Sequence, residues 1–284
     1  MPRIPPSVFR QALRTDPLLV PLLPVTRSLS GAQAELRWLR KEVPKPKLPW
    51  AIVQRSNYRP LQYILGDQPF LDLSIKCAEG TLIPRWETEE WIARIKPFIS
   101  NVKIIDACTG TGCVALSFNG TGSNIVGIDI DTSCLSLAKF NQQSNRCDDI
   151  VHWAQCDILN WTDDLHHVCK GVNFLVSNPP YIPWEEYTKL DRSVKNFEPQ
   201  LALVGDLEFY NALVHNLLEP NLNTCDGFVF EVGNVNQIHH VRDLVKKHGW
   251  NVGYLMDSAG YHRCVVGWKP DGRFDFKKLC DFVY

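Results

Sequence analysis

From residue 102 onward, short apolar runs alternate with longer stretches in which hydrophobic and polar residues are mixed. Between several of the apolar runs lie helix-like stretches, at Thr132–Ser144, Asp206–Leu218 and Val235–His248. This alternation predicts an α/β fold with a parallel sheet and helices on both of its faces. The expected strands are Val102–Ala107, Asn124–Asp129, Ile150–Cys156, Asn173–Ser177, Gly227–Val232, Val252–Leu255 and Arg263–Trp268, the last returning as an edge strand.

The first part of the chain has a helical pattern instead. Apolar residues at 8, 9, 12 and 13 follow Pro5-Pro6, which predicts a short helix that Ser7 caps and Pro17 ends. A second helix is expected over Ala32–Val43. The prolines at 44, 46 and 49 alternate with lysines and predict a stiff linker.

A β-hairpin is expected between these helices and the α/β region, because residues 60–83 contain Gly66-Asp67 and the alternating run 70–75. The pattern therefore divides the chain into four parts. These are an N-terminal helical segment (1–58), a linker hairpin (59–83), the α/β domain (84–268) and a C-terminal tail (269–284), for which no structure is predicted.

The first forty residues hold six arginines, no lysine and two acidic residues. An amphipathic, arginine-rich and acid-poor start is typical of a mitochondrial targeting segment. The alternative is the first helix of a small accessory domain, and both descriptions can hold together.

Composition narrows the class of protein. With 284 residues, 45% hydrophobic and 21% charged, the chain has an ordinary globular balance. Thirty basic residues against 31 acidic ones give a formal charge of −1, which disfavours stable binding to nucleic acid. No apolar run is long enough to cross a membrane. The ten cysteines form no C-x-x-C pair, so we expect reduced thiols and no metal site.

A glycine loop follows the first strand of the α/β region. Asp106 ends the strand, where its carboxylate can face a ligand, and Thr109, Gly110 and Gly112 lie in the loop itself. Glycines there allow a sharp turn and a close approach of a ligand to the backbone. A glycine pair alone is a weak signal, because many such loops merely turn.

Two acidic residues strengthen the case for a nucleoside ligand. Asp129 ends the second strand, where a carboxylate accepts hydrogen bonds from both ribose hydroxyls. The loop lacks the complete G-x-G-x-x-G pattern that cradles a pyrophosphate. An acidic site without a phosphate cradle favours a cationic adenosine ligand, S-adenosylmethionine. Asp157, after the third strand, is then placed near the adenine amino group, or it caps a helix.

The fourth strand ends in Asn178-Pro179-Pro180-Tyr181. Two prolines fix two φ angles and remove two N–H donors, so the corner is rigid and its carbonyls are free to accept. Asn178 adds an oxygen acceptor and Tyr181 an aromatic face. Together they predict a clamp for a planar –NH₂ group. Such a nitrogen is a poor nucleophile, so catalysis would come from aligning its lone pair with the methyl group.

Several motifs in order resemble the HemK-type glutamine N5-methyltransferases of class 1 peptide-chain release factors. The resemblance covers about residues 59–268. It includes R-P-L-Q-Y-I-L-G at 59–66, L-I-P-R-W-E-T-E at 82–89, the loop at 106–112, Asp129, N-P-P-Y at 178–181, F-E-P at 197–199, E-V-G at 231–233 and Asp257…Gly260…Arg263. Trp86 stands in place of the usual proline, Cys108 in place of a common glycine, and 204–208 departs from the usual G-G-x-D-G.

The resemblance implies a seven-stranded, Rossmann-like class I methyltransferase sheet with a small N-terminal helical domain. It implies S-adenosylmethionine as cofactor and the glutamine of a release factor's Gly-Gly-Gln tip as substrate, here in a mitochondrial form supporting translation termination. Asn178, Pro179, Pro180 and Tyr181 would bind the substrate amide, with Asn178 also beside the cofactor. We expect a monomer.

Two other functions remain open at this point. Adenine N6-methyltransferases acting on DNA or RNA share the N-P-P-Y motif, although the near-zero net charge speaks against that class. A non-catalytic, methyltransferase-like binding subunit would need a damaged site, whereas the glycine loop, the acids and the N-P-P-Y corner are all intact.

Overall fold

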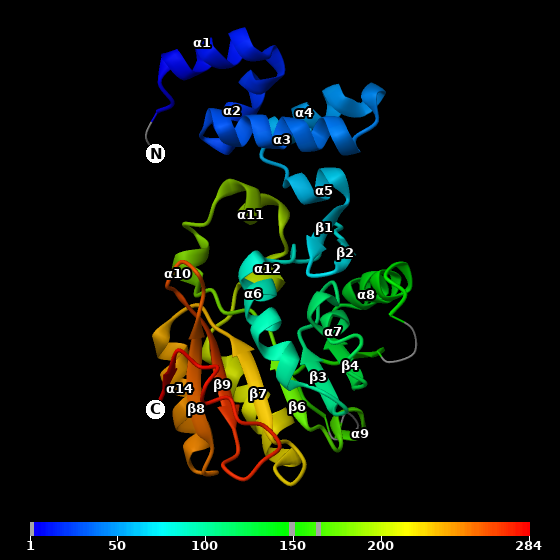
Figure 1. Cartoon of the computed structure of the whole chain (residues 1–284), viewed down its shortest axis with the longest axis vertical. Coiled ribbons are helices and arrows are strands. Elements are labelled where there is room, and N and C mark those ends of the chain that lie inside the picture. The colour runs from blue at the N-terminus through cyan, green and yellow to red at the C-terminus, as the bar shows by residue number, and fades with distance from the viewer. Residues whose placement is uncertain (1–2, 148–150, 163–165) are drawn as a thin grey trace.

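The computed structural model describes residues 3–147, 151–162 and 166–284. Its larger part is an α/β domain built around an eight-stranded mixed sheet (Figure 1). The strand order is β10-β8-β9-β7-β6-β3-β4-β5. The five strands from β7 to β5 are parallel, and β8, β9 and β10 pair antiparallel. The bounds are β3 (Lys103–Ala107), β4 (Asn124–Asp129), β5 (Val151–Gln155), β6 (Phe174–Ser177), β7 (Gly227–Glu231), β8 (Asn251–Met256), β9 (His262–Trp268) and β10 (Phe282–Val283). The prediction of a Rossmann-like α/β fold is confirmed, but the expected number of seven strands was wrong, because β10 from the C-terminal tail adds an eighth strand by pairing with β8.

All seven expected strands are present, although Ile150, the first residue of one of them, lies outside the described residues. One placement was wrong. The run Arg263–Trp268 does not lie at an edge: β9 is inserted between β7 and β8. Its residues 264–268 are all buried, as in a strand covered on both faces. The edge position is taken by β10, from the tail for which no structure was predicted.

The strand order reverses at β3, which pairs with β4 on one side and β6 on the other. In open parallel sheets, ligands bind at the carboxyl ends of the strands beside such a reversal. The glycine loop, Asp129 and Asn178 follow β3, β4 and β6, so the topology brings them to one place.

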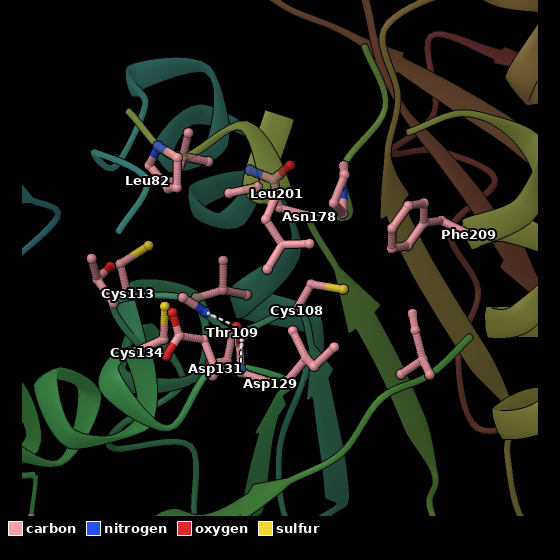
Figure 2. A pocket seen from close by; sticks show the side chains of 18 of the residues that line it. Leu82, Cys108, Thr109, Cys113, Asp129, Asp131, Cys134, Asn178, Leu201 and Phe209 are labelled. Carbon is pink, nitrogen blue, oxygen red and sulfur yellow. Dashed lines mark hydrogen bonds between the residues drawn. The ribbon is translucent and has the colours of Figure 1, made fainter. Parts of the chain in front are cut away.

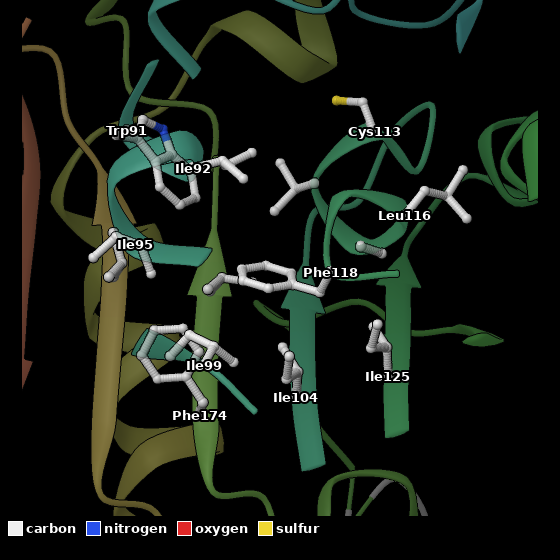
Figure 3. Close-up of a cluster of buried hydrophobic side chains, with 14 of the residues drawn as sticks. Trp91, Ile92, Ile95, Ile99, Ile104, Cys113, Leu116, Phe118, Ile125 and Phe174 are labelled. Atoms are coloured by element: carbon white, nitrogen blue, oxygen red, sulfur yellow. The ribbon is translucent and has the colours of Figure 1, made fainter. Parts of the chain in front are cut away.

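Helices pack on both faces of the sheet. On one face, Trp91 of α6 joins Phe118 and Phe174 in a buried cluster (Figure 3). On the other face, Tyr210 and Val241 belong to a second buried cluster. The helices of this domain are α6 (Trp86–Ile95), α7 (Cys113–Ser117), α8 (Thr132–Ser144), α9 (His166–Cys169), α10 (Trp184–Tyr187), α11 (Arg192–Phe197), α12 (Gln200–Leu203), α13 (Leu207–Ala212) and α14 (Val235–Lys246). The predicted helix over 206–218 continues past α13 as a π-helix, Leu213–Leu218.

The N-terminal segment forms a separate helical layer with its own core, drawn at the top of Figure 1. Its helices are α1 (Pro6–Thr15), α2 (Leu23–Thr26), α3 (Leu29–Glu42), α4 (Leu48–Ser56) and α5 (Leu61–Leu65). Two predictions were wrong here. Ser7 does not cap α1, which Pro5 precedes without a side-chain cap. The proline-rich stretch is not a linker, because Pro49 lies in the first turn of α4, where its missing N–H costs nothing.

The hairpin is confirmed as β1 (Asp67–Phe70) and β2 (Leu73–Lys76), which pair antiparallel. None of the helices in the described ranges combines the length and the apolar character of a membrane span. All ten cysteines are free thiols.

Candidate active site

A cavity of about 320 Å³ opens at the carboxyl ends of β3, β4 and β6 (Figure 2). Five of the residues predicted to bind a ligand line it, namely Thr109, Gly110, Asp129, Asp157 and Asn178, and Pro180 of the diproline corner lines it as well. The structure therefore collects side chains that lie as far as 71 residues apart in the sequence around one space.

Two residues that were predicted to bind the cofactor do not line this cavity. One is Gly112, whose α-carbon faces the Trp153 ring and Ala138 instead. The other is Asp106. It is fully buried beneath the glycine loop, where its Oδ2 accepts hydrogen bonds from Thr109 Oγ1 (2.5 Å) and from the N–H of Ala115 (3.0 Å). Burial raises the pKa of Asp106 to about 7. The carboxylate predicted to face a ligand thus shapes the loop from below.

Asp129 connects the loop to the second strand. Its Oδ2 accepts from the N–H of Gly110 (2.8 Å) and its Oδ1 from the N–H of Asp131 (3.0 Å). Each carboxylate oxygen has a further lone pair, so both remain able to accept from a ligand hydroxyl. Burial raises the pKa of Asp129.

The wall of the cavity suits a cationic nucleoside. Among the described residues that line it, three are carboxylates, Asp129, Asp131 and Asp157, and one is an arginine, Arg85, which is paired with Glu198. A side chain at Gly110 would meet no protein atom within 4 Å, so the loop leaves open space there. Four cysteines (108, 113, 134, 156) add neutral thiols, because burial raises the pKa of each.

Asp157 forms a turn rather than a helix cap. Its Oδ1 accepts from the N–H of Leu159 (2.9 Å) and its Oδ2 from Asn160 Nδ2 (2.6 Å). No helix begins here in the described chain around residue 157. These two hydrogen bonds hold the carboxylate in the lining of the cavity.

A second cavity, of about 230 Å³, lies beside the first. Pro179 and Tyr181 line it with apolar side chains of the segment 182–203. The two cavities share Leu82, Arg85, Asn178 and Ala202. Asn178 therefore lies between the larger cavity, whose lining suits a nucleoside, and the second cavity, whose lining is mostly apolar.

The Asn-Pro-Pro-Tyr corner is held by buried polar side chains that the sequence reasoning did not assign. Asn178 Nδ2 donates to Thr88 Oγ1 (3.2 Å), and the Tyr181 hydroxyl donates to Glu231 (3.1 Å). Gln237 Nε2 donates to the carbonyl of Tyr181 (2.9 Å). Thr88 and Glu231 belong to motifs of the resemblance, which was the available signal, whereas Gln237 carried none.

Two motifs that are distant in sequence meet above the cavities. Arg85 forms an ion pair with the buried Glu198 (2.7 Å), which also accepts from the N–H of Ile83 (3.1 Å). This contact joins residues 82–89 to the F-E-P segment at 197–199, and both segments contribute to the lining of the larger cavity.

Across residues 3–147, 151–162 and 166–284, no three His, Cys, Asp or Glu side chains are grouped as metal ligands would be.

Comparison with known proteins gives a partial match to one family. Residues 101–197 match the family model described as RNA cap guanine-N2 methyltransferase. This stretch is about a third of the chain and covers the glycine loop, Asp129 and the diproline corner.

Full-length relatives are more informative. The chain is 39% identical to "Mitochondrial MRF1 N(5)-glutamine methyltransferase MTQ1" of Saccharomyces cerevisiae, over 96% of this chain and 91% of the relative. It is 32% identical to "Probable MRF1 mitochondrial N(5)-glutamine methyltransferase mtq1" of Schizosaccharomyces pombe, over 94% and 98%. A "Release factor glutamine methyltransferase" of Thermodesulfovibrio yellowstonii is 34% identical over 76% and 78%.

Among solved structures, the N-terminal domain of human METTL16 in complex with SAH aligns with a TM-score of 0.55 at 18% identity, over 85% of this chain and 95% of that one. At this identity, the similarity shows a shared fold alone.

Proposed function

This chain belongs to the family of release factor glutamine methyltransferases, and from this we propose that Asn178–Tyr181 hold the substrate glutamine. The enzyme transfers a methyl group from S-adenosylmethionine to the side-chain amide nitrogen of a release factor glutamine. One observation carries the assignment of the site: Asn178 lines both cavities, so it touches the donor space and the acceptor space at once.

The acceptor side is built for a carboxamide. Asn178 Oδ1 and the carbonyl of Pro179 accept the two amide protons, since Pro180 and Pro179 leave no competing N–H donors in the corner. The ring of Tyr181 covers one side of the amide. These acceptors favour a nitrogen that becomes positive during methyl transfer.

The second cavity offers no general base. Of the described residues that line it, none is an acid or a histidine, and its polar members are Arg85, Asn178 and Tyr181. Acceleration therefore comes from aligning the amide lone pair with the methyl group, and the proton leaves to water afterwards.

The donor side occupies the larger cavity. S-adenosylmethionine supplies an electrophilic methyl group on a sulfonium when it is bound. Asp129 would accept hydrogen bonds from the ribose hydroxyls, Asp157 would accept from the adenine amino group, and Thr109 and Gly110 would form the loop beside the cofactor. Gly112 and Asp106 contribute to cofactor binding indirectly, because they stabilise the conformation of the glycine loop.

The finer identity of the substrate is also part of the proposal: the glutamine of the Gly-Gly-Gln tip of a mitochondrial class 1 release factor. Purified enzyme, labelled S-adenosylmethionine, release factor and structured RNA in one reaction test it. We expect mass spectrometry to find the methyl group on the Gly-Gly-Gln peptide, and no label when its glutamine is replaced by alanine. Label in RNA with none in the release factor would overturn the assignment.

Two substitutions separate the two sides of the site. Asn178→Ala should lower turnover far more than affinity for S-adenosylmethionine, because Asn178 holds the amide. Asp129→Ala should weaken cofactor binding by about 1–3 kcal/mol through lost hydrogen bonds to a charged acceptor. Calorimetry for the cofactor and single-turnover rates for methyl transfer give both quantities. Equal losses of both in Asn178→Ala would mean that its role is misassigned.

We also propose a mitochondrial location, which the arginine-rich start of the chain and the names of the two fungal relatives support. Fractionation of cells that express a C-terminally tagged chain tests it, and a cytosolic tag would contradict it. A monomeric state and the lack of stable nucleic-acid binding stay predictions.

A further inference from the structure

Glu231 is a buried carboxylate that the proposed reaction does not use. It ends β7, beside the strand β6 that delivers Asn178, and it is 1% exposed. Its Oε2 accepts from Thr88 Oγ1 (2.7 Å) and from Trp91 Nε1 (2.8 Å), and its Oε1 accepts from the hydroxyl of Tyr181 (3.1 Å). Glu231 therefore joins α6 to the diproline corner.

In the hydrogen bonds to Glu231 Oε2, the donor and the acceptor are fixed by the chemistry of the side chains. An indole N–H can only donate, so Trp91 makes Oε2 of Glu231 an acceptor, and a proton on this carboxyl group would sit on Oε1 instead. The single hydroxyl proton of Thr88 is then committed to Oε2. The oxygen of Thr88 is left as an acceptor, and it faces the side-chain amide of Asn178 at 3.2 Å.

We propose that Thr88 is a positioning residue for methyl transfer. Trp91 fixes Glu231, Glu231 holds the Thr88 hydroxyl, and Thr88 orients the Asn178 amide so that its oxygen faces the substrate; we call this chain of contacts the relay. This inference rests on the function proposed above. The terminal torsion of an asparagine has two nearly equivalent orientations. Without these contacts, the Asn178 amide could rotate by half a turn about its terminal torsion. Its NH₂ group would then face the NH₂ group of the substrate, and the hydrogen bond from the substrate amide to Asn178 Oδ1 would be lost.

The backbone of the corner is held independently of this relay. Gln237 is fully buried, and its side chain makes four hydrogen bonds. It donates to the Tyr181 carbonyl and to Asp206, and it accepts from the N–H of Gly233 and from the Tyr210 hydroxyl. The position of the corner therefore does not depend on Thr88, which leaves the direction of the Asn178 amide as the property that Thr88 controls.

Thr88→Val tests the relay because it keeps the shape of the side chain and removes the hydroxyl. We expect turnover to fall about 10- to 100-fold, the loss of one positioned hydrogen bond, while affinity for S-adenosylmethionine stays within about twofold. Thr88→Ser keeps the hydroxyl and should restore turnover to within a few-fold of the unmodified enzyme. Wild-type turnover in Thr88→Val, or an equal loss in both variants, would overturn the relay.

Glu231→Gln provides a second test that does not require Thr88→Val to fold. A glutamine can place its oxygen toward Thr88 and Trp91, which preserves the direction of the Thr88 contact, while its NH₂ group reverses the hydrogen bond with the Tyr181 hydroxyl. Turnover should therefore fall less than in Asn178→Ala. A loss as large as that of Asn178→Ala would mean that the charge of Glu231 matters and not its acceptor pattern, and this overturns the proposal.

Combining Thr88→Val with Asn178→Ala separates the relay from the site assignment. If Thr88 acts through Asn178, the double variant should have the single-turnover rate of Asn178→Ala alone. Losses that multiply would overturn the relay and leave the site assignment intact. Wild-type turnover in Asn178→Ala would overturn both.

Discussion

Gly110 and Gly112 lie two residues apart in the loop after β3, and they are glycines for different reasons. Both have positive φ, at +54° and +79°. A Cβ on Gly112 would come within 2.8 Å of the Trp153 ring and 2.9 Å of Ala138, whereas one on Gly110 would meet nothing within 4 Å. Gly112 is therefore required by packing, and Gly110 by the space of the cofactor cavity.

We predict opposite phenotypes for alanine at these two positions. Gly112→Ala should destabilise the fold by about 2–4 kcal/mol, the sum of left-handed strain and overpacking. Gly110→Ala should cost only about 1 kcal/mol of strain but weaken cofactor binding. Urea unfolding and cofactor titration of both variants check this, and equal destabilisation would contradict the packing argument.

Single residues also show the limit of what the sequence predicts. The sequence places Asp106 and Asp129 alike, each at the end of a strand beside the loop. In the structure Asp129 lines the cavity, and Asp106 lies beneath the loop and bonds to Thr109 and Ala115. Which face a strand-end side chain takes depends on packing against neighbouring elements, and strand position alone does not contain that information.

At the scale of elements, the C-terminal tail is part of the α/β core. Phe276 is fully buried in the same cluster as Phe174, with which its ring is in contact, and β10 pairs with β8. The hydrophobic pattern after residue 270 is too short and mixed to predict this. Strands with long apolar runs were predictable, whereas the two-residue β10 depends on the edge that β8 offers.

Two phenylalanines of the tail test its structural role. Phe276→Ala removes a fully buried ring and should destabilise the protein by about 3–5 kcal/mol. Phe282→Ala is the matched control, since Phe282 is 49% exposed and its loss should cost less than about 1 kcal/mol. Thermal or chemical unfolding measures both changes. If the tail did not contribute to the core, both substitutions would change the free energy of unfolding by small and similar amounts.

At the scale of the whole molecule, much of the architecture could be predicted, because the hydrophobic patterns of successive segments all indicate the same fold. The alternation after residue 102 predicts the sheet, and the helical pattern before residue 60 predicts a helical segment, although it did not predict the elements around Leu19 and Ile52 that complete the core of this segment. The order of the last strands could not be predicted, because a strand connected by a hairpin can lie at the edge of a sheet or between two other strands. The pairing of β9 with both β7 and β8 shows that it lies between them.

The stability of the whole molecule should also carry a pH signature of Asp106. Burial raises the pKa of Asp106 to about 7, from an ordinary value of 3.8. Between these two values the folded state holds a proton that the unfolded state has released. The stabilising contribution of this group is therefore complete below about pH 4 and is lost as the pH rises through about 7.

Asp106→Asn isolates this contribution, because an asparagine resembles the protonated carboxyl group and its oxygen can accept from Thr109 and Ala115 as Oδ2 does. We expect the variant to gain stability relative to the unmodified enzyme as the pH rises from 5 to 8, by a difference on the order of 2–4 kcal/mol. Urea unfolding of both proteins at each pH gives this difference directly, and other titrating groups cancel in it. A difference that does not change with pH would mean that Asp106 stays ionised beneath the loop, and the loop would then be held by a buried charge and not by a neutral acid.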